Sequence, residues 1–260
     1  MSDLIQVERQ DGIATITINR PEKRNALTPA MLAQLRTIAE GFREEPETRA
    51  VIIRGAGDTF SVGADIGGMG GPTPPTVQLR RTAEAGSLLM RALREIAQPT
   101  ICVVQGVATG GATCIATACD FRIGTTNARI GYGEVKLGIN LMWHALPLAI
   151  HTVGLARAKA MVMSGDLFDA DRMHAWGFFD ELVDSEKRDE AACVMARRYA
   201  ALPPVAVQMI KRSANAYAGA LDQAIMHADM DQWLLATRTA DFAEGVRSFF
   251  EKRPPVFTGE

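Results

Sequence analysis

Residues 110–120 read GGATCIATACD, and this stretch lies between two short apolar segments, 100–105 and 121–124. Two glycines followed by an unbroken run of small side chains predict a tightly packed helix over 111–118. The apolar segments have the length of buried strands, so the sequence predicts a strand, a helix and a strand in succession. No acid, base or charged nucleophile occurs before Asp120, which leaves a glycine-lined helix entrance chemically almost bare.

The same alternation of strands and helices extends through the first two-thirds of the chain. The predicted elements are a hairpin that turns at Asp11-Gly12, a helix that begins at Pro29 after Thr28, strands over 50–55 and 128–131, and helices over 79–96 and 142–153. This order predicts an α/β core with parallel strands.

Beyond Leu155 the pattern is almost wholly helical. One helix is expected to begin at Pro203-Pro204, and two more are expected over 221–250. We therefore divide the chain into a core, residues 1–200, and a helical C-terminal region, residues 201–260. The glycine- and proline-rich run over 67–75 is expected to be mobile and without regular structure.

The composition excludes several classes of protein. The chain has 260 residues, of which 47% are hydrophobic and 22% charged, with a formal net charge of -2. This charge offers no general attraction to nucleic acid or to an anionic membrane. The longest apolar runs are too short to cross a bilayer, and the N-terminus has scattered charges where a signal peptide has an apolar core. We expect a cytoplasmic protein without nucleic-acid or membrane partners.

The cysteines show neither a CxxC pair nor the Cys/His spacing of a metal site. They are Cys102, Cys114, Cys119 and Cys193. This pattern predicts reduced, buried thiols and no metal centre.

Three glycine-containing turns follow three predicted strands, at 55–57, 106–111 and 131–134. Glycine lets a backbone N–H group approach a ligand closely. Two such groups, one beside Gly63 and one after Gly110, would be able to bind one oxygen that gains negative charge, and the helix dipole would add to this. Tight turns in a packed sheet would leave the same pattern, so both interpretations stay open at this point.

Six blocks of sequence resemble a known family in their order and spacing. They are INRPEKRNALT (18–28), FSVGADI (60–66), QGVATGGATCIATACDFRI (105–123), ARIGYGEVKLGI (128–139), SGDLFDADRMHAWGFFDELV (164–183) and DFAEGVRSFFEKRPPVF (241–257). Over nearly the whole chain the sequence resembles the crotonase superfamily, that is, the enoyl-CoA hydratase/isomerase family. The resemblance implies a spiral of ββα units followed by a helical C-terminal trimerisation region, in a homotrimer or a dimer of trimers.

The resemblance also implies a substrate and a set of site residues. The substrate would be an acyl-CoA thioester, so coenzyme A arrives as part of the substrate and no cofactor is bound permanently. By resemblance, the backbone N–H groups of Ala64 and Gly111 form an oxyanion hole for the thioester carbonyl. The residues that match the family's CoA-binding segments are Lys23, Arg24, Ala26, Ala64, Asp65 and Ile66. Basic side chains there suit the phosphates of CoA, although Lys23 and Arg24 also fit a solvated turn.

The same resemblance explains why the predicted helix over 111–118 carries no acidic or basic side chain. Hydratases of the family carry a pair of glutamates, of which one falls on Glu134 and the other on Cys114. Water addition benefits from two carboxylates, whereas a double-bond shift needs only one. The chain therefore resembles the single-glutamate Δ3,Δ2-enoyl-CoA isomerases, and isomerisation is the favoured reaction. Cys114 is either a nucleophile or, as is more common for a thiol on an apolar helix, inert packing.

Two departures from the family pattern affect the acyl pocket. Gly133 stands where the family usually has proline, and residues 141–145, LMWHA, stand where it has a Pro-Gly-rich turn. Large side chains such as Trp143 should reshape the pocket, which makes a straight-chain substrate doubtful. His144 is either a second acid or base, or a histidine on a helix face.

Two alternatives to an isomerase stay open. The first is a hydratase whose second acid is His144 or a bound water. The second is a non-catalytic relative that binds acyl-CoA or RNA. The net charge of -2 and the lack of a basic run argue against RNA, and the presence of Glu134 argues for catalysis.

Overall fold

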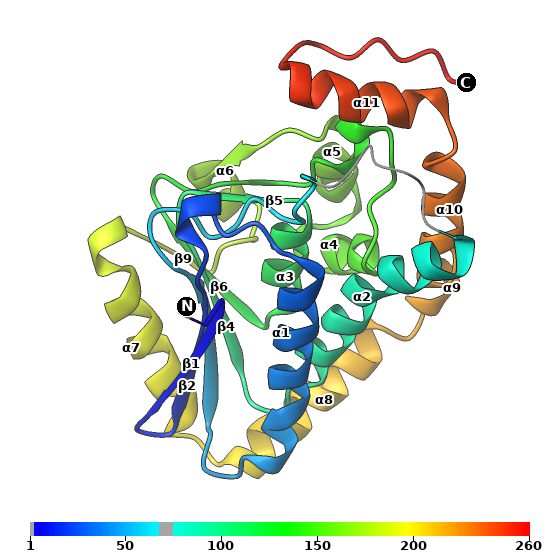
Figure 1. Cartoon of the computed structure of the whole chain (residues 1–260). Helices are drawn as coiled ribbons and strands as arrows, with labels where there is room; N and C mark the ends of the chain where they lie inside the picture. Colours follow the sequence, from blue (N-terminus) through cyan, green and yellow to red (C-terminus); the bar gives the residue numbers. More distant parts are fainter. Residues whose placement is uncertain (1–2, 68–74) are drawn as a thin grey trace.

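The computed structural model describes residues 3–67 and 75–260, and its main feature is a six-stranded sheet (Figure 1). The strand order is β1-β2-β3-β4-β6-β9, with β1 Ile5–Gln10, β2 Ile13–Ile18, β3 Ala50–Gly55, β4 Thr100–Val104, β6 Phe121–Thr125 and β9 Glu181–Val183. β1 pairs antiparallel with β2, and the later pairs are parallel. The predicted α/β core with parallel strands is confirmed. The run predicted to be mobile lies, at residues 68–74, outside the described residues.

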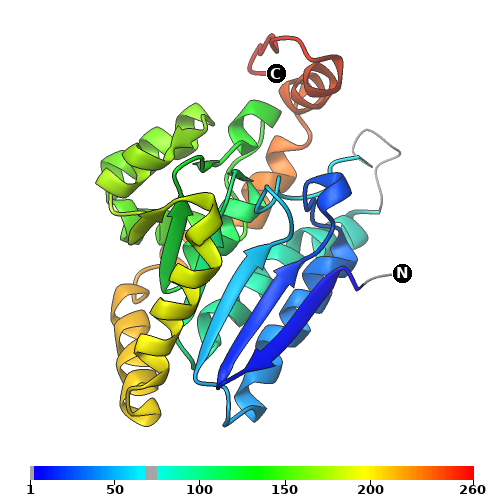
Figure 2. The same cartoon turned by 90° about the vertical axis from the view of Figure 1, so that its left-hand side faces the viewer.

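Helices cover both faces of this sheet because its central strands bury side chains on both. In β3, Ile52 belongs to the core on one face and Ile53 to the core on the other. Helix α7 (Arg188–Ala200) packs on the first face, whereas α1 (Pro29–Gly41), α2 (Thr76–Glu95) and α3 (Gly111–Ala118) pack on the second, as Figures 1 and 2 show. Successive strand residues point to opposite faces, so a continuous apolar run indicates a sheet that is covered on both sides.

A second, three-stranded sheet connects the segments that carry the predicted site. β5 (Val107–Thr109) pairs parallel with β7 (Arg129–Gly131), and β7 pairs antiparallel with β8 (Phe168–Asp169). β5 follows β4 and leads into α3, while β7 follows β6 and leads into the 3-10 helix η3 (Glu134–Leu137). The neighbouring strands β4 and β6 of the large sheet are thus followed by β5 and β7, which pair with each other in the small sheet.

The remaining elements are helices. They are α4 Ala145–Val153, α5 Leu155–Ser164, α6 Ala170–Ala175, α8 Pro204–Ala218, α9 Gln223–Met226, α10 Asp229–Ala236 and α11 Ala240–Glu251, with 3-10 helices η1 Pro21–Lys23, η2 Phe42–Glu44 and η4 Ser185–Lys187. Helix α3 has the predicted bounds. The first hairpin turns at Asp11 and Gly12, as predicted, with left-handed φ angles of 53° and 74°.

The prediction of a helix over 142–153 is wrong at its start. The helix begins at Ala145, because Trp143 and His144 have φ angles of 63° and 58°. Left-handed residues cannot belong to a right-handed helix, and neither glycine nor proline marks this break in the sequence. His144 therefore occupies the N-cap position of α4 rather than a helix face.

The almost wholly helical pattern predicted beyond Leu155 is found, but two strands that were not predicted interrupt it. β8 and β9 lie in this part, and they are two and three residues long. Such short strands show no usable period-2 pattern, and each exists through pairing with a distant strand. In addition, α2 begins three residues before the predicted start at 79, and residues 221–250 form three helices where two were predicted.

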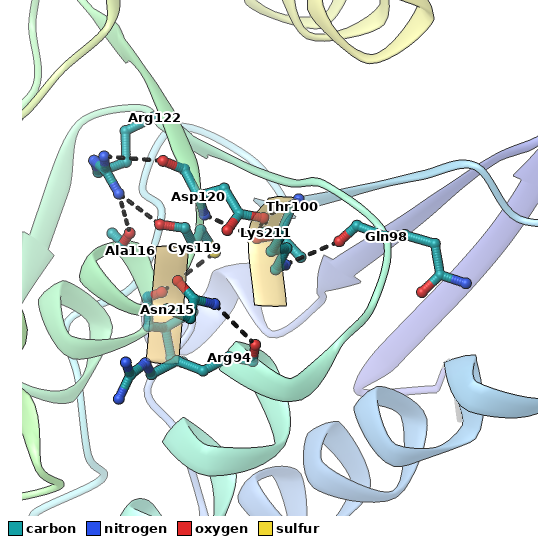
Figure 3. Close-up of polar contacts among 10 residues, drawn as sticks. Arg94, Gln98, Thr100, Ala116, Cys119, Asp120, Arg122, Lys211 and Asn215 are labelled. Atoms are coloured by element: carbon teal, nitrogen blue, oxygen red, sulfur yellow. Dashed lines mark hydrogen bonds and ion pairs between the residues drawn. The ribbon is translucent and has the colours of Figure 1, made fainter. Parts of the chain in front are cut away.

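Helix α8 is attached to the core by a polar cluster (Figure 3). Lys211 Nζ lies 2.5 Å from Asp120 Oδ2 and donates to the Gln98 carbonyl oxygen at 2.9 Å. Asp120 Oδ2 also accepts from the backbone N–H of Thr100 at 2.8 Å, at the start of β4. The Lys211 and Asp120 side chains are 9% and 19% exposed, so this ion pair is largely removed from water. The acid that ends the bare stretch thus has a structural partner.

We predict that Lys211→Met destabilises the fold by about 3 kcal/mol, because it leaves the mostly buried Asp120 carboxylate without its cation. The free energy of unfolding in urea measures this effect. The matched control is Arg212→Met, which removes an exposed cation from the next position and should change stability by less than about 0.5 kcal/mol. Equal effects of the two substitutions would contradict the assignment.

Candidate active site

The register of β5 on β7 places the two predicted catalytic segments side by side. Thr109 lies opposite Gly131 in this parallel pair, so the residues that follow each strand leave from the same edge. The backbone N–H of Gly110 donates to the Gly131 carbonyl oxygen at 3.1 Å. Thr113 Oγ1 donates to the same oxygen at 2.8 Å and to that of Ala108 at 3.0 Å. These bonds hold the N-terminus of α3 beside the turn that carries Glu134.

The third glycine turn joins the other two at the same place. Ser61 forms a parallel bridge with Ala108 of β5, which brings the segment after Ser61 against the start of α3. Gly63 has a φ of 83°, and a Cβ there would lie 2.5 Å from the Thr109 carbonyl oxygen and 3.2 Å from the Gly111 nitrogen. Only glycine allows this approach. The three turns that the sequence singled out therefore converge.

Within the described residues, this geometry leaves the N–H groups of Ala64 and Gly111 without an acceptor. Asp65 N–H donates to the Leu27 carbonyl, and Leu27 N–H donates to that of Gly63, so the N–H of Ala64 between them points away from Leu27. Gly111 is the first residue of α3, where N–H groups have no intrahelical acceptor. Neither group donates to an acceptor among residues 3–67 and 75–260. Such a pair can stabilise an oxygen that gains negative charge, and the oxyanion-hole role stays a prediction.

The carboxyl group of Glu134 lies directly beside this helix entrance. A Cβ on Gly110 would be 3.2 Å from Glu134 Oε1, so the carboxyl occupies space that only glycine leaves. Glu134 Oε2 is buried and has no hydrogen-bond partner among the described residues. Burial raises the pKa of Glu134 to about 7, against 4.5 for a free glutamate. A carboxylate with this pKa can accept and return a proton near neutral pH.

Cys114 is buried on α3, within reach of the electrostatic field of the Glu134 carboxylate. Burial, followed by the charges of Glu134 and Asp229, raises the pKa of the Cys114 thiol well above its usual value. The thiol therefore stays protonated at neutral pH, and a protonated thiol is a poor nucleophile. Of the two alternatives that the sequence left open for Cys114, this favours packing.

Trp143 and His144 both have a left-handed backbone, and their side chains lie in different surroundings. The indole of Trp143 packs against Gly111, where a Cβ would lie 2.4 Å from the ring. Burial, followed by the charges of Arg91 and Arg94, lowers the pKa of His144, so its imidazole is neutral at pH 7. Both arginines belong to α2. The structure thus places Trp143 at the helix entrance and His144 near α2, and a role of His144 as acid or base stays a prediction.

The predicted CoA-binding residues lie on two adjoining segments, 23–26 and 64–66. Lys23 and Arg24 are exposed at the end of η1. Arg20 connects the segments, since its Nη1 donates to the Ala26 carbonyl at 3.1 Å and to Asp65 Oδ2 at 2.7 Å. Hydrogen bonds from Arg20 and from the Gly67 N–H, with the charges of Arg20 and Lys23, lower the pKa of Asp65. The CoA-binding role of these residues stays a prediction.

Sequence reasoning missed three residues that organise this region. The amide of Asn25 is buried and donates to the carbonyls of three residues, 56, 59 and 60. Arg20, two residues after the end of β2, joins segments 23–26 and 64–66 through its side chain. Asp229, on α10, is buried and accepts from the His144 backbone N–H at 2.8 Å, and burial raises its pKa to about 6. Local sequence offers no signal for Asp229, because the partner lies 85 positions away.

The fold and the site have counterparts among known proteins. The family model described as enoyl-CoA hydratase/isomerase matches residues 8–260. The chain belongs to the enoyl-CoA hydratase/isomerase family. Members of this family act on CoA thioesters, so acyl-CoA is the substrate class. The resemblance found in the sequence and the predicted crotonase-like fold class are confirmed.

Individual relatives cover the whole length of this family member. The 1,2-epoxyphenylacetyl-CoA isomerase of Escherichia coli K12 is 32% identical over 100% of both chains. The crotonyl-CoA hydratase of Syntrophomonas wolfei is 30% identical over 97% of each. The crystal structure of an enoyl-CoA hydratase from Mycobacterium avium subsp. paratuberculosis is 28% identical, with a TM-score of 0.89, and covers 98% of this chain and 99% of that one. Most of the similar curated proteins carry the name of a hydratase, and the Escherichia coli relative above carries that of an isomerase. The names therefore leave the reaction of this chain unresolved.

Within residues 3–67 and 75–260, no group of three or more His, Cys, Asp or Glu side chains is placed to hold a metal ion. None of the helices described there has the length and apolar character needed to cross a membrane.

We predict that Glu134→Gln stabilises the fold above neutral pH. Because one pKa unit corresponds to about 1.4 kcal/mol, ionising Glu134 in the folded protein costs on the order of 3 kcal/mol. Between pH 4.5 and about 7 the folded state holds more protons than the unfolded state, so the free energy of unfolding falls as pH rises. The glutamine variant lacks this cost. It should match the parent near pH 4.5 and exceed it by on the order of 3 kcal/mol at pH 8.

Urea unfolding at several pH values measures this difference. The control is Glu47→Gln, which neutralises an exposed glutamate and should show no gain that grows with pH. A stability difference that stays constant from pH 4.5 to pH 8 would show that Glu134 ionises as freely in the folded chain as in the unfolded one.

Proposed function

We propose that this enzyme catalyses Δ3,Δ2-enoyl-CoA isomerisation with Glu134 as its only proton-transfer carboxylate. The observation that carries the proposal is the Glu134 carboxyl beside Gly110, whose buried Oε2 has no hydrogen-bond partner in the described part of the chain and whose pKa is about 7. At the position of the second family glutamate stands Cys114, whose thiol stays protonated because its pKa is raised. One carboxylate suffices for a double-bond shift, since the same group removes and returns the proton.

The reaction would proceed through a dienolate of the thioester. The Glu134 carboxylate removes a proton from C2, and the electron pair of the broken C–H bond forms a C1–C2 double bond while negative charge moves to the thioester oxygen. The N–H groups of Ala64 and Gly111 stabilise that oxygen. Glu134 then returns the proton to C4: the thioester carbonyl forms again, the C1–C2 double bond moves to C2–C3, and the electron pair of the C3–C4 double bond forms the new C4–H bond. Lys23, Arg24, Ala26, Ala64, Asp65 and Ile66 hold the CoA part of the substrate, which needs no permanently bound cofactor.

Hydration of a 2-enoyl-CoA is the second candidate, because most of the similar curated proteins are named hydratases. In this reaction Glu134 would activate a water, and the second acid would be His144 or a further bound water. Burial, Arg91 and Arg94 lower the pKa of His144, which makes it a poor acid at neutral pH. For this reason we place hydration second.

The assembly that we propose is a homotrimer or a dimer of trimers, with residues 201–260 as the region that makes subunit contacts. Its support is a set of large apolar side chains on the C-terminal helices that are exposed in the single chain. They include Met209, Ile210, Tyr217 and Leu221 on or after α8, Leu235 on α10, and Phe249 and Phe250 on α11. Large exposed apolar patches on soluble proteins usually mark interaction sites.

The proposed reaction predicts that Glu134→Gln lowers turnover about a hundredfold or more, because a general base is lost, while CoA-ester binding persists. The assay supplies 3-hexenoyl-CoA and 2-hexenoyl-CoA separately and follows both double-bond migration and water addition. For the parent enzyme, kcat/KM should rise with pH towards about 7 as Glu134 loses its proton. Faster water addition than migration would assign a hydratase, neither reaction would indicate a non-catalytic relative, and near-normal turnover of the variant would exclude Glu134.

A second prediction concerns the missing acid. Cys114→Glu should raise water addition to 2-hexenoyl-CoA relative to the parent, because it restores a second carboxyl near Glu134. The gain is limited, since Thr113 Oγ1 already donates to two carbonyls and offers the new acid no proton. The larger side chain also overpacks α3, at a cost of about 1–3 kcal/mol. The matched control is Cys114→Gln. If both variants raise hydration equally, position 114 only shapes the pocket.

A further inference from the structure

The indole of Trp143 is packed between two glycines on different helices. A Cβ on Gly86 of α2 would lie 2.0 Å from the indole, and a Cβ on Gly111 of α3 would lie 2.4 Å from it. Gly86 stands in the middle of a 20-residue helix, where glycine is destabilising relative to alanine. Its presence there has a physical reason, because any side chain would collide with the ring. The ring therefore has a specific seat.

This seat adjoins the position of the reacting thioester. Gly111 provides one of the two N–H groups that we assign to the thioester oxygen, and the ring packs against the same residue. The acyl chain starts at the carbonyl carbon, so its first carbons must pass the indole. Trp143 is only half-buried, and part of its surface is free for contact. A large rigid ring at this point takes up space that an acyl chain extending from the Gly111 N–H would otherwise fill.

The backbone that carries the ring is in an unfavourable conformation. Trp143 and His144 are consecutive left-handed residues without glycine, with φ angles of 63° and 58°. Each such residue is strained and persists only when its surroundings hold it. Without an external partner, this segment would relax and move the ring.

A buried carboxylate on a distant helix supplies that partner. Asp229 Oδ2, at the first residue of α10, accepts from the His144 backbone N–H at 2.8 Å. Asn140 Nδ2 donates to the Asp229 backbone carbonyl at 3.2 Å, so α10 contacts the segment at both ends. A hydrogen bond to a charged acceptor is stronger than a neutral one. The Asp229 carboxylate lies close enough to the site to act electrostatically on Cys114.

We propose that Trp143 is the wall that limits acyl-chain length in this enzyme and that Asp229 is the positioning residue that holds it there. The substrate class is then a CoA ester with a short acyl chain. This inference rests on the proposed function only in that the thioester oxygen binds at Ala64 and Gly111. Asp229 takes no part in proton transfer and acts through the His144 N–H on the placement of the ring.

The test measures dissociation constants of butyryl-CoA and decanoyl-CoA by calorimetry. Both esters are saturated, so binding is independent of whether the enzyme isomerises or hydrates, and failure of the proposed reaction leaves this test intact. Trp143→Ala should improve the binding of decanoyl-CoA relative to butyryl-CoA by about tenfold or more, because each buried methylene then adds affinity. Trp143→Phe keeps a smaller ring. It should change the ratio of the decanoyl-CoA and butyryl-CoA dissociation constants in the same direction as Trp143→Ala, but to a smaller extent.

The role of Asp229 has its own set of variants. Asp229→Ala should shift the ratio of the two dissociation constants in the direction of Trp143→Ala, by about threefold or more, because the hydrogen bond to the His144 N–H no longer holds the segment. Asp229→Asn retains an oxygen that accepts from His144 N–H and should restore the parental ratio. Asp231→Ala removes an exposed carboxylate from the same helix and serves as the control. In the Trp143→Ala background, Asp229→Ala should have no further effect.

Circular dichroism establishes that each variant is folded, and Trp143→Phe carries the test of the wall if Trp143→Ala does not fold. A ratio that stays within twofold of the parent in the folded Trp143 variants would overturn the assignment of the wall. An effect of Asp229→Ala that persists in the absence of the Trp143 ring, or a failure of Asp229→Asn to restore the ratio, would overturn the positioning role.

Discussion

The parallel pairing of β5 with β7 is the constraint on which the candidate site depends. It places Thr109 opposite Gly131, so the chain turns into α3 and into η3 at one edge of one small sheet. The Gly131 carbonyl then accepts from both Gly110 N–H and Thr113 Oγ1, which holds the helix start and the glutamate turn at hydrogen-bonding distance. A slip in this register would separate the free N–H of α3 from Glu134. The glycines around this edge are required because three backbone segments meet there without room for side chains.

Burial then sets the chemistry of the groups that the pairing brings together. The small side chains of α3 allow close packing, and its residues are buried along the whole helix. In this setting the pKa of Glu134 rises to about 7, while the pKa of the Cys114 thiol rises far enough to keep it protonated. Desolvation therefore moves the pKa of the carboxyl group into the neutral range and keeps the thiol protonated. The bare helix contributes small, buried side chains to this setting, and the carboxyl group comes from the segment after β7.

The C-terminal part of the chain contacts one end of the stretch 110–120 directly and the other end through residues 140–144. Through Lys211, α8 pairs with Asp120 just after the end of α3. Through Asp229, α10 holds the strained segment whose indole packs on Gly111 at the start of α3. Both attachments use carboxylates that are largely removed from water, and such contacts are costly to break. Residues beyond 200 therefore contribute to the geometry of the candidate site, and they also carry exposed apolar side chains.

The sequence by itself determined the elements whose signals are local. The turn at Asp11-Gly12, the helix α3, the alternation of strands and helices, and Glu134 as the site's base candidate all follow from short patterns or from family blocks. β9 and the seat of Trp143 were decided only by the tertiary structure. β9 exists because β6 offers it an unpaired edge, and the backbone next to Trp143 is held through the His144 N–H by a carboxylate 85 positions away, on α10. Hydrogen bonds between distant segments leave no periodicity in the sequence. For that reason the residues that aim the site could be found only once the chain was folded.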